Sequence, residues 1–214
     1  MSARCQLVRC ERRGARPERG VLVALHADGG DARALLPLCN AIDLDCDVVA
    51  PQGPRAKSPF HSSAAPDDPR WRAYAGFAWF RRDAEGRPEP ASFGDALAQL
   101  EALVDELHER GRAPIALVGR GDGATLALGA ARAFPERLAA VVAVGALAEI
   151  PAFAERHEVP AELPMLPLDS PDTDPCGAAD RIRIFLEARR EGARDGRGRE
   201  QEAGQDLLQA HPEG

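Results

Sequence analysis

Short, continuous apolar runs recur along the chain and are separated by segments with a different periodicity. Residues 21–25 (VLVAL) and 47–51 (DVVAP) lack polar alternation, as is typical of strands that are buried on both faces. Residues 114–118 and 138–144 have the same character, and residues 163–168 form a weaker candidate because two prolines interrupt them. The pattern predicts the strands of a mostly parallel sheet.

Helical periodicity lies between these runs. The clearest case is a stripe of apolar residues at i, i+3, i+4 and i+7 spacing, which ends at Gly111 where a helix terminator is expected. Its members are Ala96, Leu97, Leu100, Leu103, Val104 and Leu107. Further helices are predicted over residues 32–42, with Pro37 near the first turn, and over 124–134 and 177–190. Strands that alternate with helices predict an α/β fold whose sheet carries helices on both faces.

The ends of the chain have a different character from its centre. Residues 1–19 form an arginine-rich segment in which residues 6–10 could add an edge strand. Residues 20–191 carry the alternating pattern and are predicted to be a single domain. Residues 192–214 are polar and glycine-rich, which predicts a tail or a degraded end of the domain. Inside the domain, residues 52–70 are proline-rich and predict a long loop.

Composition narrows the class of protein. The 214 residues carry a net charge of −7, which argues against a nucleic-acid partner. No run approaches the roughly 18 apolar residues that would cross a membrane, and the N-terminus lacks the apolar core of a signal peptide, so a cytoplasmic location is expected. The five cysteines form no C-x-x-C pair, which predicts reduced thiols and no metal site. No cofactor motif is evident, and none is expected.

Five short motifs occur in an order that matches a known family. They are VLVALHADGGD at residues 21–31, VAPQGP at 49–54, AWF at 78–80, IALVGRGDGATLA at 115–127 and FPERL at 134–138. Together they resemble the phospholipase/carboxylesterase family of α/β-hydrolases, which includes the acyl-protein thioesterases. The resemblance implies an α/β-hydrolase fold and an active site at the carboxyl ends of the strands.

The decisive departure from this family lies at its nucleophile. The family carries G-F-S-Q-G at a sharp strand-to-helix turn, where the central serine attacks the ester. This chain keeps Gly119 and Gly123 but has Gly121 at the apex. Because glycine relieves the strain of this turn and lacks a hydroxyl group, the turn is predicted to persist without a nucleophile.

The other members of the catalytic triad are also altered. The resemblance places Asp174 at the position of the acid and Gln205 at the position of the base, where the family has histidine. His211 reads as a tail residue rather than as a displaced base. Asp122 follows the apex, and it could be a displaced nucleophile or simply a carboxylate stabilised at a helix N-terminus. Cys176, close to the presumed acid, is a weaker candidate nucleophile.

Four residues are predicted to surround the oxyanion position. His26 matches the histidine that is structural in the family, and Asp28 and Asp122 match the positions whose backbone N–H groups bind the oxyanion. Trp79 belongs to an aromatic group that could line the pocket or pack against the sheet. Two carboxylates beside a developing oxyanion oppose hydrolysis and leave open a cation- or amine-binding pocket.

Two functional hypotheses follow. The first is a catalytically inactive homologue of a serine carboxylesterase or phospholipase that binds a small molecule or a protein partner. The alternative is an enzyme of the same fold with a rearranged site, using a carboxylate or a relocated nucleophile on esters or related substrates.

Overall fold

A six-stranded sheet organises the computed structural model, which describes residues 7–57, 76–145, 150–152, 158–161, 163–168 and 178–188. The strand order is β1-β3-β2-β6-β7-β8. Neighbouring strands are parallel throughout except for β1, which pairs with β3 in the antiparallel sense. The strands are β1 (Arg9–Arg12), β2 (Val21–Leu25), β3 (Asp47–Pro51), β6 (Ile115–Arg120), β7 (Ala140–Val144) and β8 (Met165–Leu168).

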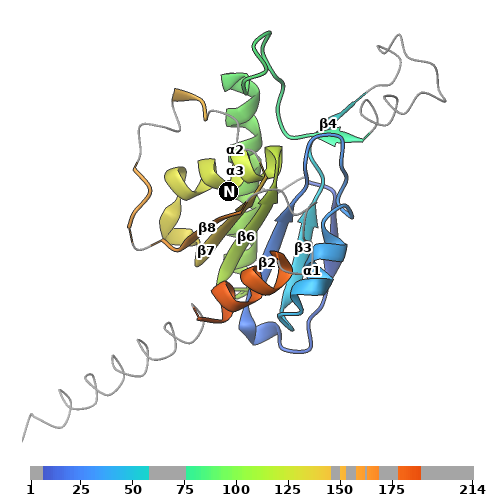
Figure 1. Cartoon of the computed structure of the whole chain (residues 1–214), viewed down its shortest axis with the longest axis vertical. Coiled ribbons are helices and arrows are strands. Elements are labelled where there is room, and N and C mark those ends of the chain that lie inside the picture. The colour runs from blue at the N-terminus through green and yellow to red at the C-terminus, as the bar shows by residue number, and fades with distance from the viewer. Residues whose placement is uncertain are drawn as a thin grey trace, which may run out of the picture.

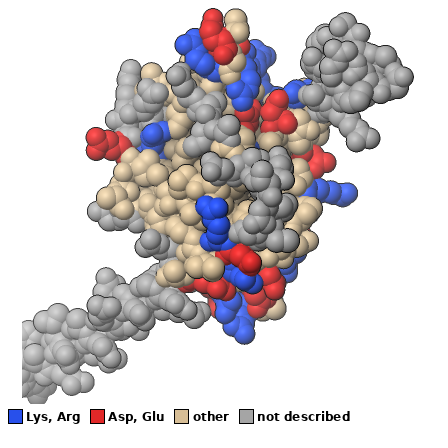
Figure 2. Space-filling model, viewed as in Figure 1, with Lys and Arg blue, Asp and Glu red and all other residues tan. Residues whose placement is uncertain are grey.

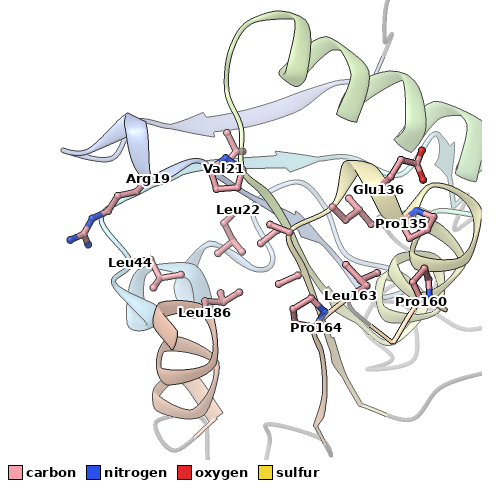
Figure 3. Close-up of a pocket in the computed structure, with 15 residues that line it drawn as sticks. Arg19, Val21, Leu22, Leu44, Pro135, Glu136, Pro160, Leu163, Pro164 and Leu186 are labelled. Atoms are coloured by element: carbon pink, nitrogen blue, oxygen red, sulfur yellow. The ribbon is translucent and has the colours of Figure 1, made fainter. Parts of the chain in front are cut away.

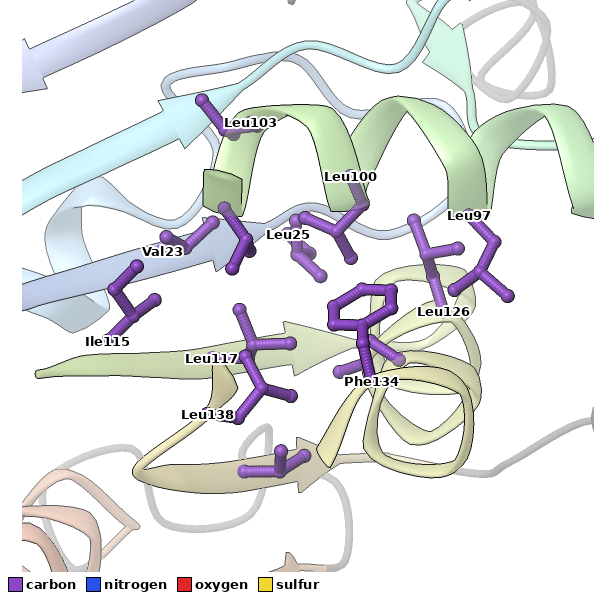
Figure 4. Close-up of a cluster of buried hydrophobic side chains, with 14 of the residues drawn as sticks. Val23, Leu25, Leu97, Leu100, Leu103, Ile115, Leu117, Leu126, Phe134 and Leu138 are labelled. Carbon is purple, nitrogen blue, oxygen red and sulfur yellow. The ribbon is translucent and has the colours of Figure 1, made fainter. Parts of the chain in front are cut away.

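Two helices cover one face of this sheet (Figure 1). Helix α2 (Pro90–Glu109) packs through the apolar stripe expected from the sequence, all of whose members are buried. It contacts α3 (Asp122–Ala133) and packs over the side chains of β2 that face it, including Val23 and Leu25 (Figure 4). The N–H of Gly111 donates to the carbonyl of His108 at 2.9 Å, which confirms the predicted helix end.

The opposite face is covered by α1 (Leu36–Ile42) and by a helix over residues 178–188. Ile42 of α1 and Ile182 of the second helix are both fully buried, in one cluster with Leu22 and Val142 of the sheet. The sheet is therefore covered on both faces, as the strand–helix alternation predicts, and the α/β-hydrolase-like fold is confirmed.

Three local predictions need correction. The edge strand lies at Arg9–Arg12 rather than at residues 6–10, because its charged side chains form ion pairs at the sheet margin, such as Arg9 with Glu106 at 2.7 Å. Helix α1 begins at Leu36, next to Pro37, instead of at residue 32. The proline-rich loop begins with a strand, β4 (Arg55–Ala56), which pairs with β5 (Phe77–Ala78).

Two short 3-10 helices complete the described elements, η1 (Pro17–Arg19) and η4 (Pro135–Arg137). Basic and acidic side chains are interspersed over the face seen in Figure 2. Cys10, Cys39 and Cys46 are free thiols, and burial raises the pKa of the Cys39 thiol to about 12. None of the helices in the described part of the chain has both the length and the apolar character to span a membrane.

Candidate functional site

The turn between β6 and α3 forms the centre of the candidate site. Gly121 has φ 55° and ψ −115°, a conformation that is strained for any residue with a side chain. Its N–H donates to the carbonyl of Val144 in β7 at 3.0 Å, and its own carbonyl accepts from the N–H of Thr125 at 3.0 Å. Together these hydrogen bonds fix Gly121, the apex of the turn, at the carboxyl ends of β6 and β7.

Two flanking glycines allow the close approach that this turn requires. A Cβ atom at Gly119 would lie 2.2 Å from the carbonyl oxygen of Gly123, and a Cβ at Gly123 would lie 2.1 Å from the carbonyl oxygen of Leu25. No side chain fits at such distances from backbone atoms. The spacing of small residues in the sequence is therefore explained by contact between β6, α3 and β2.

The apex itself faces Ala27 of the loop that follows β2. A Cβ atom built at Gly121 would lie 3.3 Å from the Ala27 Cβ, which is tighter than an ordinary van der Waals contact. Residues 25–31 (LHADGGD) resemble the family motif LHGxGGD, and this resemblance places a glycine at the position of Ala27. The loop methyl group therefore occupies part of the space that a residue with a side chain at the apex would need.

His26 is a structural residue of this loop. It is 1% exposed. Its Nε2 accepts from the N–H of Gly53 at 2.9 Å, while its Nδ1 lies 2.7 Å from the carbonyl oxygen of Ala27. These partners require the neutral tautomer that carries its proton on Nδ1. Burial lowers the pKa of the imidazole, which favours the same neutral form.

Trp79 packs against the loop that follows β2 and binds its backbone at His26. Its Nε1–H donates to the carbonyl of His26 at 2.8 Å, and its ring lies 4.9 Å from the imidazole, centroid to centroid. The side chain is fully buried and does not line the neighbouring cleft, whereas Phe80 does. Of the two alternatives left open for Trp79, the structure favours packing over lining the pocket, and the indole positions the loop through its hydrogen bond.

The two acidic residues beside the apex are each paired with a cation. Asp28 Oδ2 lies 2.6 Å from Nζ of Lys57, and Asp122 Oδ1 accepts from Nη2 of Arg82. Burial raises the pKa of the Asp122 carboxyl, and Arg82 opposes that rise. The second oxygen of Asp122 is buried and has no hydrogen-bond partner among the described residues.

A cleft of about 640 Å³ opens beside these pairs. Its lining contains four basic and two acidic side chains. The charged members are Arg55, Lys57, Arg81, Arg82, Asp28 and Asp122. Arg55 also pairs with Asp95 at 3.2 Å, outside the lining. Both carboxylates already contact cations, so basic side chains are in excess on the lining of the cleft.

Several predicted site residues lie outside the described residues. They are Asp174, Gln205, His211 and Cys176. The structure brings together Gly121, Asp122, Asp28 and His26, and it adds Ala27, Lys57 and Arg82, which the sequence analysis missed. Two of these had a signal in the sequence. Lys57 is the only lysine of the chain, and Ala27 departs from the glycine of its motif.

Comparison with known proteins supports the same class. The model of the phospholipase/carboxylesterase family matches residues 9–168. A carboxylesterase from Bacillus cereus is 16% identical, with 86% of this chain and 95% of the other covered and a TM-score of 0.61. Esterase PE8 is 24% identical over 85% and 84% of the two chains, with a TM-score of 0.58. A carboxylesterase from Mesorhizobium loti is 22% identical over 80% and 75%, with a TM-score of 0.53. At these identities the structures show a shared fold. No curated protein sequence gives a significant match.

Proposed function

Because this chain belongs to the phospholipase/carboxylesterase family, we propose that it has lost serine-ester hydrolysis and binds a small anionic molecule in the cleft beside the β6–α3 turn. The observation that carries the first half is Gly121, which keeps the conformation of the turn but supplies no nucleophilic atom. The observation that supports the second half is the charge of the cleft.

The loss of hydrolysis rests on more than one missing hydroxyl group. The Ala27 methyl group crowds the apex, so a serine introduced there would also need the loop to move by a few tenths of an ångström. Asp122 is the residue whose backbone N–H would serve the oxyanion, and it adds a buried carboxylate close to that position. That charge raises the energy of a developing oxyanion to the extent that Arg82 does not offset it. Each feature acts against the same reaction.

The preference for an anion follows from the balance of charges in the cleft. Asp28 and Asp122 are each engaged by one cation. Two further basic side chains remain on the lining: Arg81, and Arg55, which pairs with Asp95 outside it. Helix α3 also begins at this cleft, and its N-terminal dipole favours negative charge. A carboxylate or phosphate of modest size matches this environment, and it would need no catalytic group.

A rearranged enzyme is less well supported. A carboxylate nucleophile must be ionised and free to approach its substrate. Asp28 is held by Lys57, and Asp122 is buried, paired with Arg82 and more readily protonated than an ordinary aspartate. Neither residue has the environment of a nucleophile.

Ester hydrolysis tests the first half of the proposal. The unmodified chain is expected to hydrolyse short p-nitrophenyl esters no faster than buffer. Gly121→Ser combined with Gln205→His should exceed either single change, since nucleophile and base act as a unit. Adding Asp122→Gln should raise the rate further by removing charge beside the oxyanion. A measurable kcat in the unmodified chain that a single substitution abolishes would overturn the proposal and identify a displaced nucleophile.

The single lysine provides a direct test of the second half. Reductive methylation with ¹³C-formaldehyde labels Lys57 and the α-amino group, and it retains the charge of both. Titration with hexanoate or inorganic phosphate should shift the Lys57 NMR signal saturably, while hexanol should not. The α-amino signal serves as the internal reference.

A matched pair of variants locates the effect in the cleft. Arg81→Gln removes one basic side chain from the lining of the cleft and should weaken anion binding severalfold. Arg33→Gln removes one exposed charge elsewhere and should leave binding unchanged. If neither anion shifts the Lys57 signal, or if hexanol shifts it equally, the proposed anion preference is wrong.

A further inference from the structure

A second cavity lies at the opposite end of the sheet from the β6–α3 turn. It has a volume of about 490 Å³ and borders the amino-terminal ends of β2, β6 and β7 (Figure 3). Val21 and Leu22 begin β2, Ala116 belongs to β6 and Ala140 begins β7. Leu186 of the helix over residues 178–188 closes one side. The candidate site occupies the carboxyl ends of the same strands, so the two spaces are separate.

The walls of this cavity are almost entirely apolar. Thirteen of its fifteen lining residues are Val, Leu, Ala or Pro, and the other two are Arg19 and Glu136. Leu22 belongs to the core cluster on one face of the sheet, and Leu138 belongs to the cluster on the other. The cavity therefore joins the ends of both cores. Water in such a space finds few hydrogen-bond partners.

The size and lining match those of ligand sites, which enclose roughly 300–1,000 Å³ of mainly apolar surface with a few polar groups that fix orientation. The two charged residues differ in their availability. Glu136 lies 3.4 Å from Nε of Arg137, and as an acidic residue it offers no positive charge to a carboxylate. The side chain of Arg19 is half-buried and forms no hydrogen bond or ion pair within the described residues. Its stem borders the cavity while its guanidinium extends outward (Figure 3).

We propose that this cavity binds an amphiphilic monocarboxylate, with its apolar tail among the strand ends and its carboxylate at Arg19. The tail replaces water against Leu22, Ala116 and Leu186, where no polar group competes for it. A guanidinium recognises a carboxylate through paired hydrogen bonds, which gives the ligand its orientation. This site is independent of the anion cleft, and the presence or absence of hydrolysis at Gly121 does not affect it.

Isothermal titration calorimetry with decanoate, below its micelle concentration, tests the proposal on the intact chain. With saturating inorganic phosphate present to occupy the anion cleft, decanoate should bind with 1:1 stoichiometry and at least tenfold more tightly than decanol. Arg19→Gln should abolish this difference between the two ligands, whereas Arg33→Gln, which also removes one positive charge, should preserve it.

Substitutions that fill the cavity provide a second test of the proposal. Ala116→Leu should weaken decanoate binding tenfold or more, and Ala102→Leu on α2, another half-buried alanine, should not. Ala139→Leu, at a more exposed part of the same lining, covers the case in which Ala116→Leu does not fold. Absence of saturable binding would overturn the proposal and would indicate that another part of the chain or a second copy fills the space. Binding that the wall variants do not weaken, or that is equal for decanol, would also overturn it.

Discussion

Gly121→Ser is the most informative single substitution in this chain. At φ 55° and ψ −115° a non-glycine residue costs about 1–3 kcal/mol in backbone strain. A side chain also reduces the conformational entropy of the unfolded chain, which returns about 0.4–1 kcal/mol. With both ranges taken at their midpoints, the net loss in the free energy of unfolding should be about 1.3 kcal/mol, measured by urea denaturation. An unchanged or increased stability would show that the apex is not strained and that the turn is not a nucleophile elbow.

The contact with Ala27 adds a separate and testable contribution. Because the new Cβ would lie 3.3 Å from the Ala27 Cβ, Ala27→Gly should relieve part of the cost of Gly121→Ser. A double-mutant cycle should give a favourable coupling of about 0.5 kcal/mol or more, as is common for residues in contact. Gly111→Ser is the control, since its φ is +69° but nothing lies within 4 Å of an added Cβ. If Ala27→Gly rescues both serine variants equally, or neither, the crowding argument fails.

Three further predictions concern the residues around the apex. Trp79→Phe removes the donor to the His26 carbonyl and should destabilise the fold by about 1–3 kcal/mol in urea denaturation; a neutral result would mean that the loop is held by other contacts. Burial raises the pKa of Asp122, so the folded protein loses stability as this carboxyl ionises with rising pH. The stability of Asp122→Asn relative to the parent should therefore increase from acidic to neutral pH. A relative stability that decreases over that range would contradict this. Burial lowers the pKa of His26, so the unfolded chain binds this proton more readily than the folded protein does. Stability should therefore fall as pH drops below the ordinary histidine value of 6.5. An NMR titration that gives His26 a pKa at or above that value would refute its assignment as a buried, neutral imidazole.

Much of the fold could be predicted because its determinants are local. The strand β2 matches its apolar run residue for residue, and the stripe on α2 is buried as its 3.6-residue periodicity predicts. The conformation of Gly121 was also predictable, because a glycine between Gly119 and Gly123 in that motif lies at the apex of a sharp strand-to-helix turn. These features depend on neighbours in sequence and on the chemistry of single residues.

The charge pairs at the site could not be predicted in the same way. Arg82 and Asp122 are separated by 40 positions, and Lys57 and Asp28 by 29. Neither pair has a periodicity or a spacing that marks it, and the sequence therefore suggested an acidic site. The edge strand was misplaced for a related reason, because Arg9 and Glu11 become suitable for a strand only when Glu106 and Arg112 lie beside them.

The ion pairs of Asp122 with Arg82 and of Asp28 with Lys57 change how the absence of a serine at position 121 is interpreted. A carboxylate about 4 Å from an oxyanion would cost about 4 kcal/mol at an effective dielectric of 20, and about 1.4 kcal/mol corresponds to a tenfold change in rate. Arg82 and Lys57 offset that repulsion, so the acidic residues alone do not prevent chemistry at this site. The proposed loss of hydrolysis therefore rests on the absence of a hydroxyl group at Gly121 and on the Ala27 methyl group, which disfavours a side chain at the apex. The cleft beside the turn has two carboxylates that are paired with cations and further basic side chains on its lining, which supports the proposed binding of an anion.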